Sequence, residues 1–316
     1  MPKTAVFFFA LALALPAAAQ DRTIKFLVGF PAGAGLDTMT RLVADRMRER
    51  LGQPVVVENR PGAAGQIAMT TLKNSPPDGQ TLVMTPLVTV VTAPHLYPKL
   101  PYDAFADFAP VAHAANFMFA FAVGPGVPAN SLADFVAIVG KDQKFGNYAS
   151  AAAGSLPHFF SILFGDTAKI KLNHIGYRGT GPALSDLLGG QISAFMGVVS
   201  DVATQHKAGR LRALATSGAR RARELPDVPT FKELGYDIEG GGWYAAYAPA
   251  KTPRDVLERL AGAIVEAIKS PEVRGKLEAL GMEPTGLGSA DLARIHRSDH
   301  DKWGPVIRAS GFKPDS

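Results

Sequence analysis

Strand-like apolar runs alternate with stretches of helical periodicity in the first part of this chain. The apolar runs occupy residues 24–30, 55–58 and 81–84. A helix is predicted from about Asp37, because apolar residues recur on one face as far as Leu51 and Gly52 is placed to end it. This alternation predicts βαβ units and a mostly parallel sheet flanked by helices.

A second series of the same kind begins near residue 120. Its strand-like runs occupy residues 119–123, 145–149, 171–177, 191–199 and a glycine-led run at 240–249. Three amphipathic helices are predicted at residues 253–269, 271–280 and 289–310. We therefore expect two α/β lobes, with residues 20–122 and 241–316 in lobe 1 and residues 123–240 in lobe 2.

The N-terminal segment has the pattern of a secretory signal peptide. Lys3 precedes the apolar run 5–15, Pro16 breaks that run, and the small residues Ala17 to Ala19 form a cleavage site. About 20 apolar residues are needed to span a bilayer, and this run is shorter. We expect cleavage between Ala19 and Gln20, which leaves 297 of the 316 residues and lowers the formal charge from +5 to +4.

The composition excludes several kinds of site and partner. The chain has no cysteine, which excludes a disulfide framework, thiolate metal sites, a cysteine nucleophile and a lipid-anchored cysteine. Hydrophobic residues make up 47% of it, enough for cores that hold by burial alone. The densest basic run, residues 210–223, lacks interleaved aromatic residues, so we expect a solvated face and no nucleic-acid partner.

Three loops share one design, in which an apolar strand leads through small residues into a helix. They lie at residues 30–37, 148–158 and 176–182. In open α/β sheets, ligands bind beyond the carboxyl ends of the strands, where these loops must lie. Free backbone N–H groups and the positive end of a helix favour an anion such as a carboxylate. One glycine-rich turn alone is more often plain turn chemistry, and Gly33-Ala34-Gly35 lacks the spacing of a dinucleotide fingerprint.

No catalytic constellation can be assembled from the sequence. Ser155 and His158 are three apart at a helix start, where Ser155 suits an N-cap and His158 either faces the ligand or packs. Neither a G-x-S-x-G elbow nor an H-E-x-x-H motif is present. His296 and His300 are four apart on the terminal helix, where a solvated face is favoured over a metal site. We expect no catalytic residue, metal or cofactor.

Several blocks of sequence are recognisable. FPAGAGLD at residues 30–37, followed by LGQPVVVENRPGAAG at residues 51–65, closely resembles the Bug family, the TctC-like extracytoplasmic solute receptors of tripartite tricarboxylate transporters. Further similar blocks lie at residues 76–79, 100–103, 177–179, 182–184, 186–191, 207–215 and 243–244. These blocks span nearly the whole mature chain in the family's order.

The resemblance implies a Venus-flytrap periplasmic binding protein that closes by hinge motion on a small mono- or dicarboxylate. It also implies a monomer in the periplasm that hands the carboxylate to membrane components of the transporter. Two alternatives remain open: a sensor that signals through a membrane partner, and an exported α/β enzyme. Adjacent genes for membrane components would favour transport over sensing, and turnover of a bound carboxylate would identify the enzyme.

The resemblance also implies which residues hold the ligand, largely through backbone groups and bound waters. In lobe 1 they are Phe30, Ala32, Gly33, Ala34 and Asp37, with Thr85 beside them. In lobe 2 they are Ser150, Gly154, Ser155, His158 and Thr180. Asp37 either caps its helix or fixes a water. Gly197 stands where many relatives carry an aspartate; if that aspartate meets an amine or hydroxyl, its loss favours a ligand without one.

Overall fold

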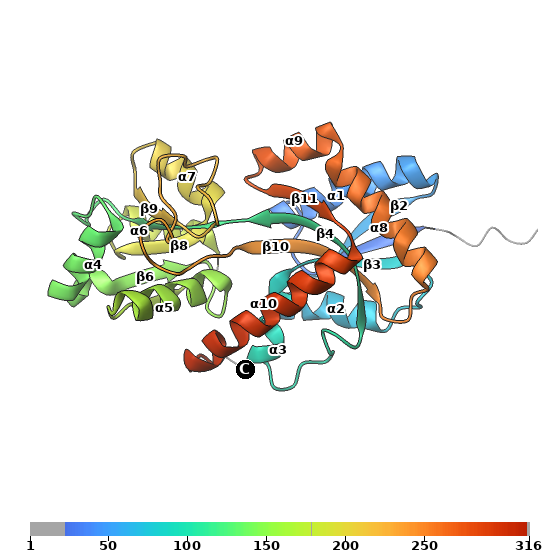
Figure 1. Ribbon diagram of the computed structural model, residues 1–316, viewed down its shortest axis with the longest axis horizontal. Helices are drawn as coiled ribbons and strands as arrows, with labels where there is room; N and C mark the ends of the chain where they lie inside the picture. The colour runs from blue at the N-terminus through green and yellow to red at the C-terminus, as the bar shows by residue number, and fades with distance from the viewer. Residues whose placement is uncertain (1–22, 178, 315–316) are drawn as a thin grey trace, which may run out of the picture.

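Two α/β lobes lie side by side in the computed structural model, which describes residues 23–177 and 179–314 (Figure 1). The expected signal peptide, residues 1–19, lies outside the described residues. Lobe 1 is built on a six-stranded sheet. Its strands, in spatial order, are β11 (Glu283–Leu287), β4 (Phe108–Phe117), β10 (Gly242–Pro249), β3 (Thr81–Pro86), β1 (Ile24–Val28) and β2 (Val55–Asn59).

Helices cover both faces of the lobe 1 sheet. One face carries α1 (Gly35–Leu51), α8 (Arg254–Lys269) and α9 (Pro271–Ala279), and the other carries α2 (Gln66–Lys73), α3 (Ala93–Leu96) and α10 (Ser289–Ala309). Two 3-10 turns, η1 (Ala63–Gly65) and η2 (Leu87–Thr89), join elements on the second face. Helix α1 forms as predicted, because Met39, Val43 and Met47 recur on its buried face and Gly52 ends it at a left-handed φ of 63°.

Lobe 2 is built on a five-stranded sheet. Its strands, in spatial order, are β7 (Asn173–Gly176), β6 (Asn147–Ser150), β8 (Ala194–Val198), β5 (Phe119–Val123) and β9 (Arg212–Thr216). Its helices are α4 (Leu132–Lys141), α5 (Leu156–Ala168), α6 (Thr180–Leu188) and α7 (Val199–Lys207), with the 3-10 turn η3 (Gln143–Gly146). The side chains of α6 and α7 pack on the face opposite to α4 and α5.

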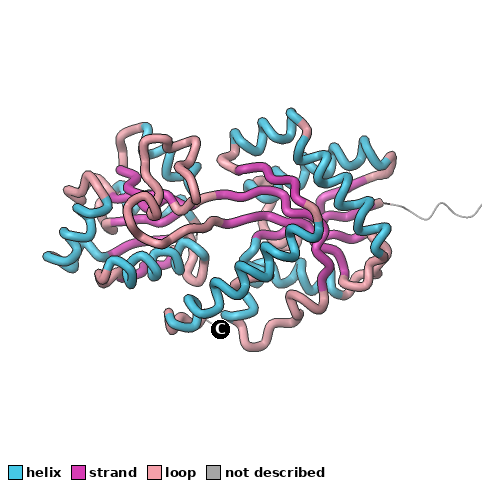
Figure 2. The backbone as a smooth tube through the Cα atoms, in the orientation of Figure 1, coloured by secondary structure: helices cyan, strands magenta, loops and turns pink. Residues whose placement is uncertain are grey.

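The α/β class is as expected, but both sheets are mixed rather than mostly parallel. Strand β10 pairs antiparallel with both β3 and β4, and β5 pairs antiparallel with both β8 and β9. The cause is the connection between the lobes: β4 runs out into β5, and the chain returns into β10 (Figure 2). Because β5 belongs to the lobe 2 sheet, the chain changes lobes at Met118, earlier than the expected boundary at residue 122.

The C-terminal segment forms a further link between the lobes, and α10 extends beneath both of them in Figure 1. Near its start, Leu292 is buried in lobe 1, and near its end the ring of Trp303 meets that of Phe160 in lobe 2 at 4.8 Å. Beyond the helix, the ring of Phe312 packs edge-on to His158 at 5.1 Å. Within the part of the chain that the structure describes, no helix has the length and apolar character that crossing a membrane requires.

Candidate ligand-binding site

The carboxyl ends of the parallel strands in one lobe face those in the other. Strand β10 leads away from lobe 2 and is antiparallel to β3, so β3 and its parallel neighbours β1 and β2 end towards lobe 2. By the same reasoning β8 and its neighbours β6 and β7 end towards lobe 1. We call the loops at these ends the facing loops: residues 29–35 and 85–89 in lobe 1, and residues 151–155, 177, 179–180 and 198–201 in lobe 2.

Most of the predicted site residues lie on or beside the facing loops. Phe30, Ala32, Gly33 and Ala34 follow β1, and Thr85 lies near the end of β3. In lobe 2, Ser150 ends β6, Gly154 and Ser155 lead into α5, and Thr180 begins α6. The predicted residues of the two lobes therefore lie at sheet ends that face each other, although they are more than 100 residues apart in the sequence.

Asp37 holds the first facing loop of lobe 1 in place. The N–H of Gly33, which has a left-handed φ of 84°, donates to Oδ2 of Asp37 at 2.9 Å. Asn59 Nδ2 donates to Oδ1 at 2.9 Å, and Arg41 Nε donates to Oδ2 at 3.0 Å. Asp37 itself is only 3% exposed. Its carboxylate is therefore occupied by the protein, and of the two predicted roles the structure favours tying down the helix start.

The same contacts set the charge of Asp37. Burial raises the pKa of this carboxyl, but hydrogen bonds from the Arg41 side chain, the Gly33 N–H and Asn59 outweigh burial and lower the pKa to about 2. Asp37 is therefore ionised at any physiological pH. Helix α1 begins at Gly35, and helix geometry leaves the N–H groups of its first turn without intrahelical acceptors. Asp37 thus fixes this loop, and the N–H groups that follow it in the first turn of α1 are available to an anion.

His158 holds a facing loop of lobe 2 in the corresponding way. The N–H of Gly154, at a left-handed φ of 73°, donates to Nδ1 of His158 at 3.0 Å. The imidazole of His158 stacks on that of His174 with ring centroids 3.8 Å apart. Ser150 Oγ donates to the carbonyl oxygen of Ala152 at 2.9 Å, so it accepts at 2.8 Å from Nε2–H of His174. These bonds join the ends of β6 and β7 to the start of α5.

Burial keeps both imidazoles neutral. It lowers the pKa of His158 to about 4, and it lowers the pKa of His174 to about 4 with a further contribution from the neighbouring His158. At neutral pH neither ring supplies a positive charge to a ligand. His158 acts as a hydrogen-bond acceptor inside the protein, so of the two predicted roles the structure favours packing.

Ser155 occupies the N-cap position of α5, but its side chain does not cap the helix. The hydroxyl instead donates backwards to the carbonyl oxygen of Ala152 at 2.6 Å. One cause is Pro157, which has no N–H to offer in the first turn. The predicted capping role is therefore wrong, and Ser155 tightens the turn before the helix.

Two predicted lobe 1 residues also have polar groups engaged within the protein. Thr85 is 2% exposed, and its hydroxyl lies 2.8 Å from that of Thr89. The carbonyl oxygen of Phe30 accepts from Asn59 Nδ2 at 3.2 Å, and its ring packs against Gly65. Both residues shape the loops that surround the end of β1.

Gly197 lies within β8, where its role is packing. A Cβ added at this position would lie 2.1 Å from the ring of Phe195, two residues earlier on the same face of the strand. Although position 197 has no aspartate, a carboxylate is present four residues later. Asp201 lies in the first turn of α7 and is hydrogen-bonded to Thr180. Sequence reasoning missed Asp201, although an acidic residue just after a predicted strand was the available signal.

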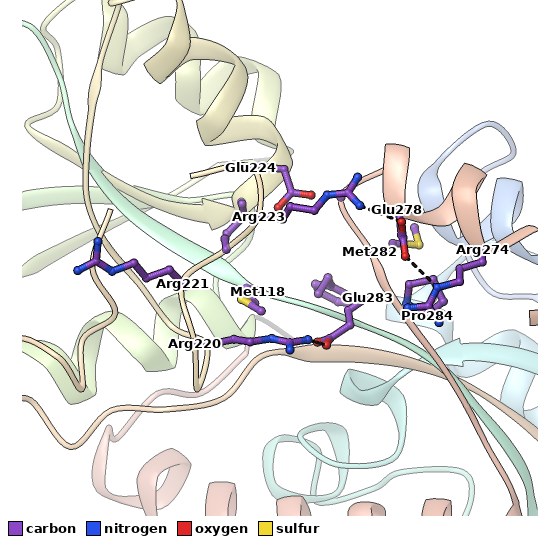
Figure 3. A pocket seen from close by; sticks show the side chains of 14 residues that line it. Met118, Arg220, Arg221, Arg223, Glu224, Arg274, Glu278, Met282, Glu283 and Pro284 are labelled. Atoms are coloured by element: carbon purple, nitrogen blue, oxygen red, sulfur yellow. Dashed lines mark hydrogen bonds and ion pairs between the residues drawn. The ribbon is translucent and has the colours of Figure 1, made fainter. Parts of the chain in front are cut away.

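A pocket of about 330 Å³ lies between the lobes near Met118 (Figure 3). Arg220 of lobe 2 pairs with Glu283 of lobe 1, and Arg223 NH1 lies 2.8 Å from Oε2 of Glu278. The basic run at residues 210–223 is a solvated face as expected, since Arg220 and Arg223 are 74% and 69% exposed, and it also makes these contacts across the lobes. Both arginines already have carboxylate partners, so this pocket offers less to an anionic ligand than the facing loops do.

His296 and His300 do not form the solvated face expected of them. His296 is 2% exposed, its Nε2 lies 3.0 Å from the carbonyl oxygen of Val90, and its ring stacks on Phe105. The ring of His300 packs on His95 with centroids 4.2 Å apart. Among residues 23–177 and 179–314, no group of three or more histidine, aspartate or glutamate side chains is placed to hold a metal ion.

Two α/β lobes joined by crossing strands, with strand-end loops that face each other, define a solute-binding protein of the periplasmic type. The chain belongs to the TctC family, described as the tripartite tricarboxylate transporter family receptor, whose model matches residues 39–312. The expected Bug-family membership is confirmed, since the Bordetella pertussis protein BugT is 32% identical over 317 residues, covering 98% of this chain and 96% of BugT.

Solved structures agree with this assignment. R. palustris Rpa4515 with adipate superposes with a TM-score of 0.81 at 28% identity, covering 93% of this chain and 98% of that one. MatC (Rpa3494) from Rhodopseudomonas palustris with bound malate has a TM-score of 0.76 at 30% identity, covering 90% and 98%. The family is one of receptors, and its solved members include a TctC solute binding protein from Polaromonas (TM-score 0.78, 26% identity, covering 92% of this chain and 99% of that one), so the chain is a receptor and not an enzyme.

Proposed function

We propose that this protein binds a small carboxylate between the facing loops of its two lobes and delivers it to the membrane components of a tripartite tricarboxylate transporter. One observation carries the proposal. In each lobe a glycine loop at positive φ is tied to the first turn of the helix that follows it, by Gly33 to Asp37 and by Gly154 to His158. Loops fixed in this way offer the free amides of helix N-termini to an anion without first having to be ordered.

The predicted residues take different roles in this proposal. The backbone around Ala32, Gly33 and Ala34 meets the carboxylate from lobe 1, and the backbone around Gly154 and Ser155 meets it from lobe 2. Thr85, Ser150 and Thr180 border the ligand, with Phe30 at the edge of the first loop. Asp37 and His158 act as positioning residues, and Gly197 supports the strand behind.

The bound solutes of the relatives support a carboxylate as ligand. Malate and adipate, named for two neighbouring structures, are both small carboxylates. The family supports delivery to a membrane transporter and a periplasmic location. We further propose a signal peptide cleaved near Ala19 and Gln20, and a monomer that diffuses freely between its ligand source and the transporter.

A thermal-shift panel tests ligand class. The protein without residues 1–19 is heated alone and with malate, adipate, benzoate or glutamate, with glucose as a neutral comparison. A ligand that binds only the native state stabilises that state and so raises the melting temperature. At a free ligand concentration one hundred times the Kd, the added stability is about 2.7 kcal/mol. At least one carboxylate is expected to raise it. A shift with glucose and with no carboxylate would contradict the proposal.

Delivery is tested separately by uptake. Cells that lack this chain are compared with cells that carry it, using the radiolabelled carboxylate that gives the largest thermal shift. Loss of uptake without the chain supports transport. Unchanged uptake, together with altered gene expression on addition of the same carboxylate, would instead support the sensor.

A further inference from the structure

We propose that Asp201 is a specificity-determining residue, which makes the receptor prefer carboxylates that also carry an ammonium or hydroxyl group over those that carry a second carboxylate. The inference rests on the proposed function, since it concerns the group at the other end of the same ligand. It names a ligand class, a hydroxy- or aminomonocarboxylate, narrower than small carboxylates in general.

The position of Asp201 in the fold supports a role at the junction of the lobes. Helix α7 begins directly after β8, whose carboxyl end faces lobe 1, and Asp201 lies in the first turn of that helix. The preceding residue, Ser200, already touches lobe 1, because a Cβ added to Gly281 would lie 2.7 Å from the Cβ of Ser200. This turn of α7 is therefore one of the places where the two lobes meet.

Asp201 acts on groups of both lobes. In lobe 2 its carboxylate is hydrogen-bonded to the side chain of Thr180, the first residue of α6 and itself on a facing loop. In lobe 1 its charge acts on Tyr244 of β10: burial, and next the charge of Asp201, raise the pKa of this phenol to about 12. The charge of Asp201 thus acts on both a facing loop of lobe 2 and the lobe 1 strand that pairs with Thr85 and Pro86.

The electrostatics of Asp201 differ from those of Asp37. Asp37 is ion-paired with Arg41, at 3.0 Å between NH2 and Oδ1. Asp201 is half-buried and, among the described residues, forms no ion pair with a lysine, arginine or histidine. Burial raises the pKa of the Asp201 carboxyl, and the Thr180 hydrogen bond lowers it again. The carboxylate consequently keeps acceptor capacity that the protein does not use.

A half-buried carboxylate with spare acceptor capacity discriminates by charge. It attracts an ammonium group, accepts from a hydroxyl and repels a second carboxylate, and these effects strengthen as water leaves on lobe closure. The amides of the glycine loops meet the first carboxylate, and Asp201 meets the group at the other end. The two ends of the ligand are therefore recognised by opposite charges.

Matched probes isolate the distal group. At each length of four, five and six carbons, three acids are compared by calorimetric titration: the ω-amino acid, the ω-hydroxy acid and the dicarboxylate. At the best-bound length, the wild-type protein is expected to bind the amino acid at least about tenfold more tightly than the dicarboxylate. Asp201→Asn is expected to remove this preference, weakening the amino acid and strengthening the dicarboxylate.

Two further variants keep the result interpretable. Asp255→Asn also replaces an aspartate in the first turn of a helix, α8, but at an exposed site, and is expected to leave every affinity unchanged. Asp201→Ser repeats the test with a smaller side chain, and ligand-free melting temperatures confirm that each variant folds.

The outcomes separate the two proposals. If wild-type protein prefers the dicarboxylate, or if Asp201→Asn leaves the ratio of affinities unchanged, the role of Asp201 is overturned while carboxylate binding stands. If no acid in the series or in the earlier panel binds, the proposed function fails, and the role of Asp201 fails with it.

Discussion

The two lobes hold their ligand loops with the same geometry and different chemistry. In lobe 1 the N–H of Gly33 donates to Asp37, and in lobe 2 the N–H of Gly154 donates to His158. Each glycine has a left-handed φ, and each acceptor lies four residues later in the first turn of a helix. One acceptor is a carboxylate with a pKa of about 2, and the other is an imidazole that must remain neutral to accept.

The difference shows how each loop is stabilised. Lobe 1 relies on a local ion pair, since Arg41 lies one helical turn after Asp37. Lobe 2 relies on contacts from distant sequence, because Phe312 packs on His158 and lies so near Gly154 that an added Cβ would be 2.7 Å from its ring. We therefore expect the lobe 1 loop to withstand acid, and the lobe 2 loop to respond to acid and to changes at the C-terminus.

Asp37→Ala is expected to have the largest effect. It removes three hydrogen bonds and leaves Arg41 and Asn59 without their buried acceptor, which is expected to lower the free energy of unfolding by about 2–3 kcal/mol. Denaturant titration measures this. The matched control is Asp45→Ala, which removes an exposed ion pair with Arg48 on the same helix and is expected to cost under about 0.5 kcal/mol. Equal costs would contradict the role given to Asp37.

His158→Phe is expected to have a smaller effect. The ring remains to stack on His174 and Phe312, but the Nδ1 acceptor for Gly154 is lost, at a cost of about 1–2 kcal/mol. The affinity for the best carboxylate of the panel is expected to fall as well, which titration calorimetry measures. Unchanged affinity would show that ligand binding does not depend on the Gly154 hydrogen bond.

Acid is expected to affect the lobe 2 loop before the lobe 1 loop. The pKa of His158 falls from its ordinary 6.5 to about 4 on folding, so the unfolded chain binds more protons between these values. Stability is therefore full above pH 6.5 and declines as the pH falls towards 4, whereas the contribution of Asp37 declines only below its ordinary 3.8. Hydrogen-exchange protection at residues 153–158 should fall between pH 7 and 5, relative to residues 32–37. A parallel loss at both loops would contradict the comparison.

The ion pairs across the lobes are expected to contribute least to stability. Arg220→Gln combined with Arg223→Gln removes exposed pairs with Glu283 and Glu278, which should cost under about 1 kcal/mol. The ligand-free protein is nevertheless expected to have a larger radius of gyration by small-angle X-ray scattering, because these pairs join the lobes. An unchanged radius would show that α10 and the crossing strands alone set the lobe arrangement.

The sequence alone predicted those helices and strands that have strong local periodicity. Helix α1 and strands β1, β2 and β3 follow from regular apolar spacing bounded by turn residues. Strand β4 was missed because its FAPVAHAANF sequence is rich in alanine and includes a proline, and β11 was missed because its EPTGL sequence contains both proline and glycine. Both strands form because β10 and β4 supply partners from elsewhere in the chain.

The candidate site was predictable by position more than by role. Small residues at strand ends located the loops around Gly33 and Gly154, because such ends face a shared edge in an α/β sheet. The roles depended on contacts that sequence spacing does not contain, such as Ser150 with His174 and Gly154 with His158. The pairing of Arg220 with Glu283 and of Arg223 with Glu278 could likewise not be predicted, because it depends on how the two lobes are arranged.

Hydrogen exchange with and without ligand tests the central claim most directly. The ligand is whichever of malate, adipate, benzoate and glutamate gives the largest thermal shift. If the carboxylate is held by both glycine loops, its addition protects the amides of residues 33–36 in lobe 1 and of residues 153–156 in lobe 2 together. Protection confined to one lobe, or to the pocket residues 220–224 and 281–283, would contradict the account.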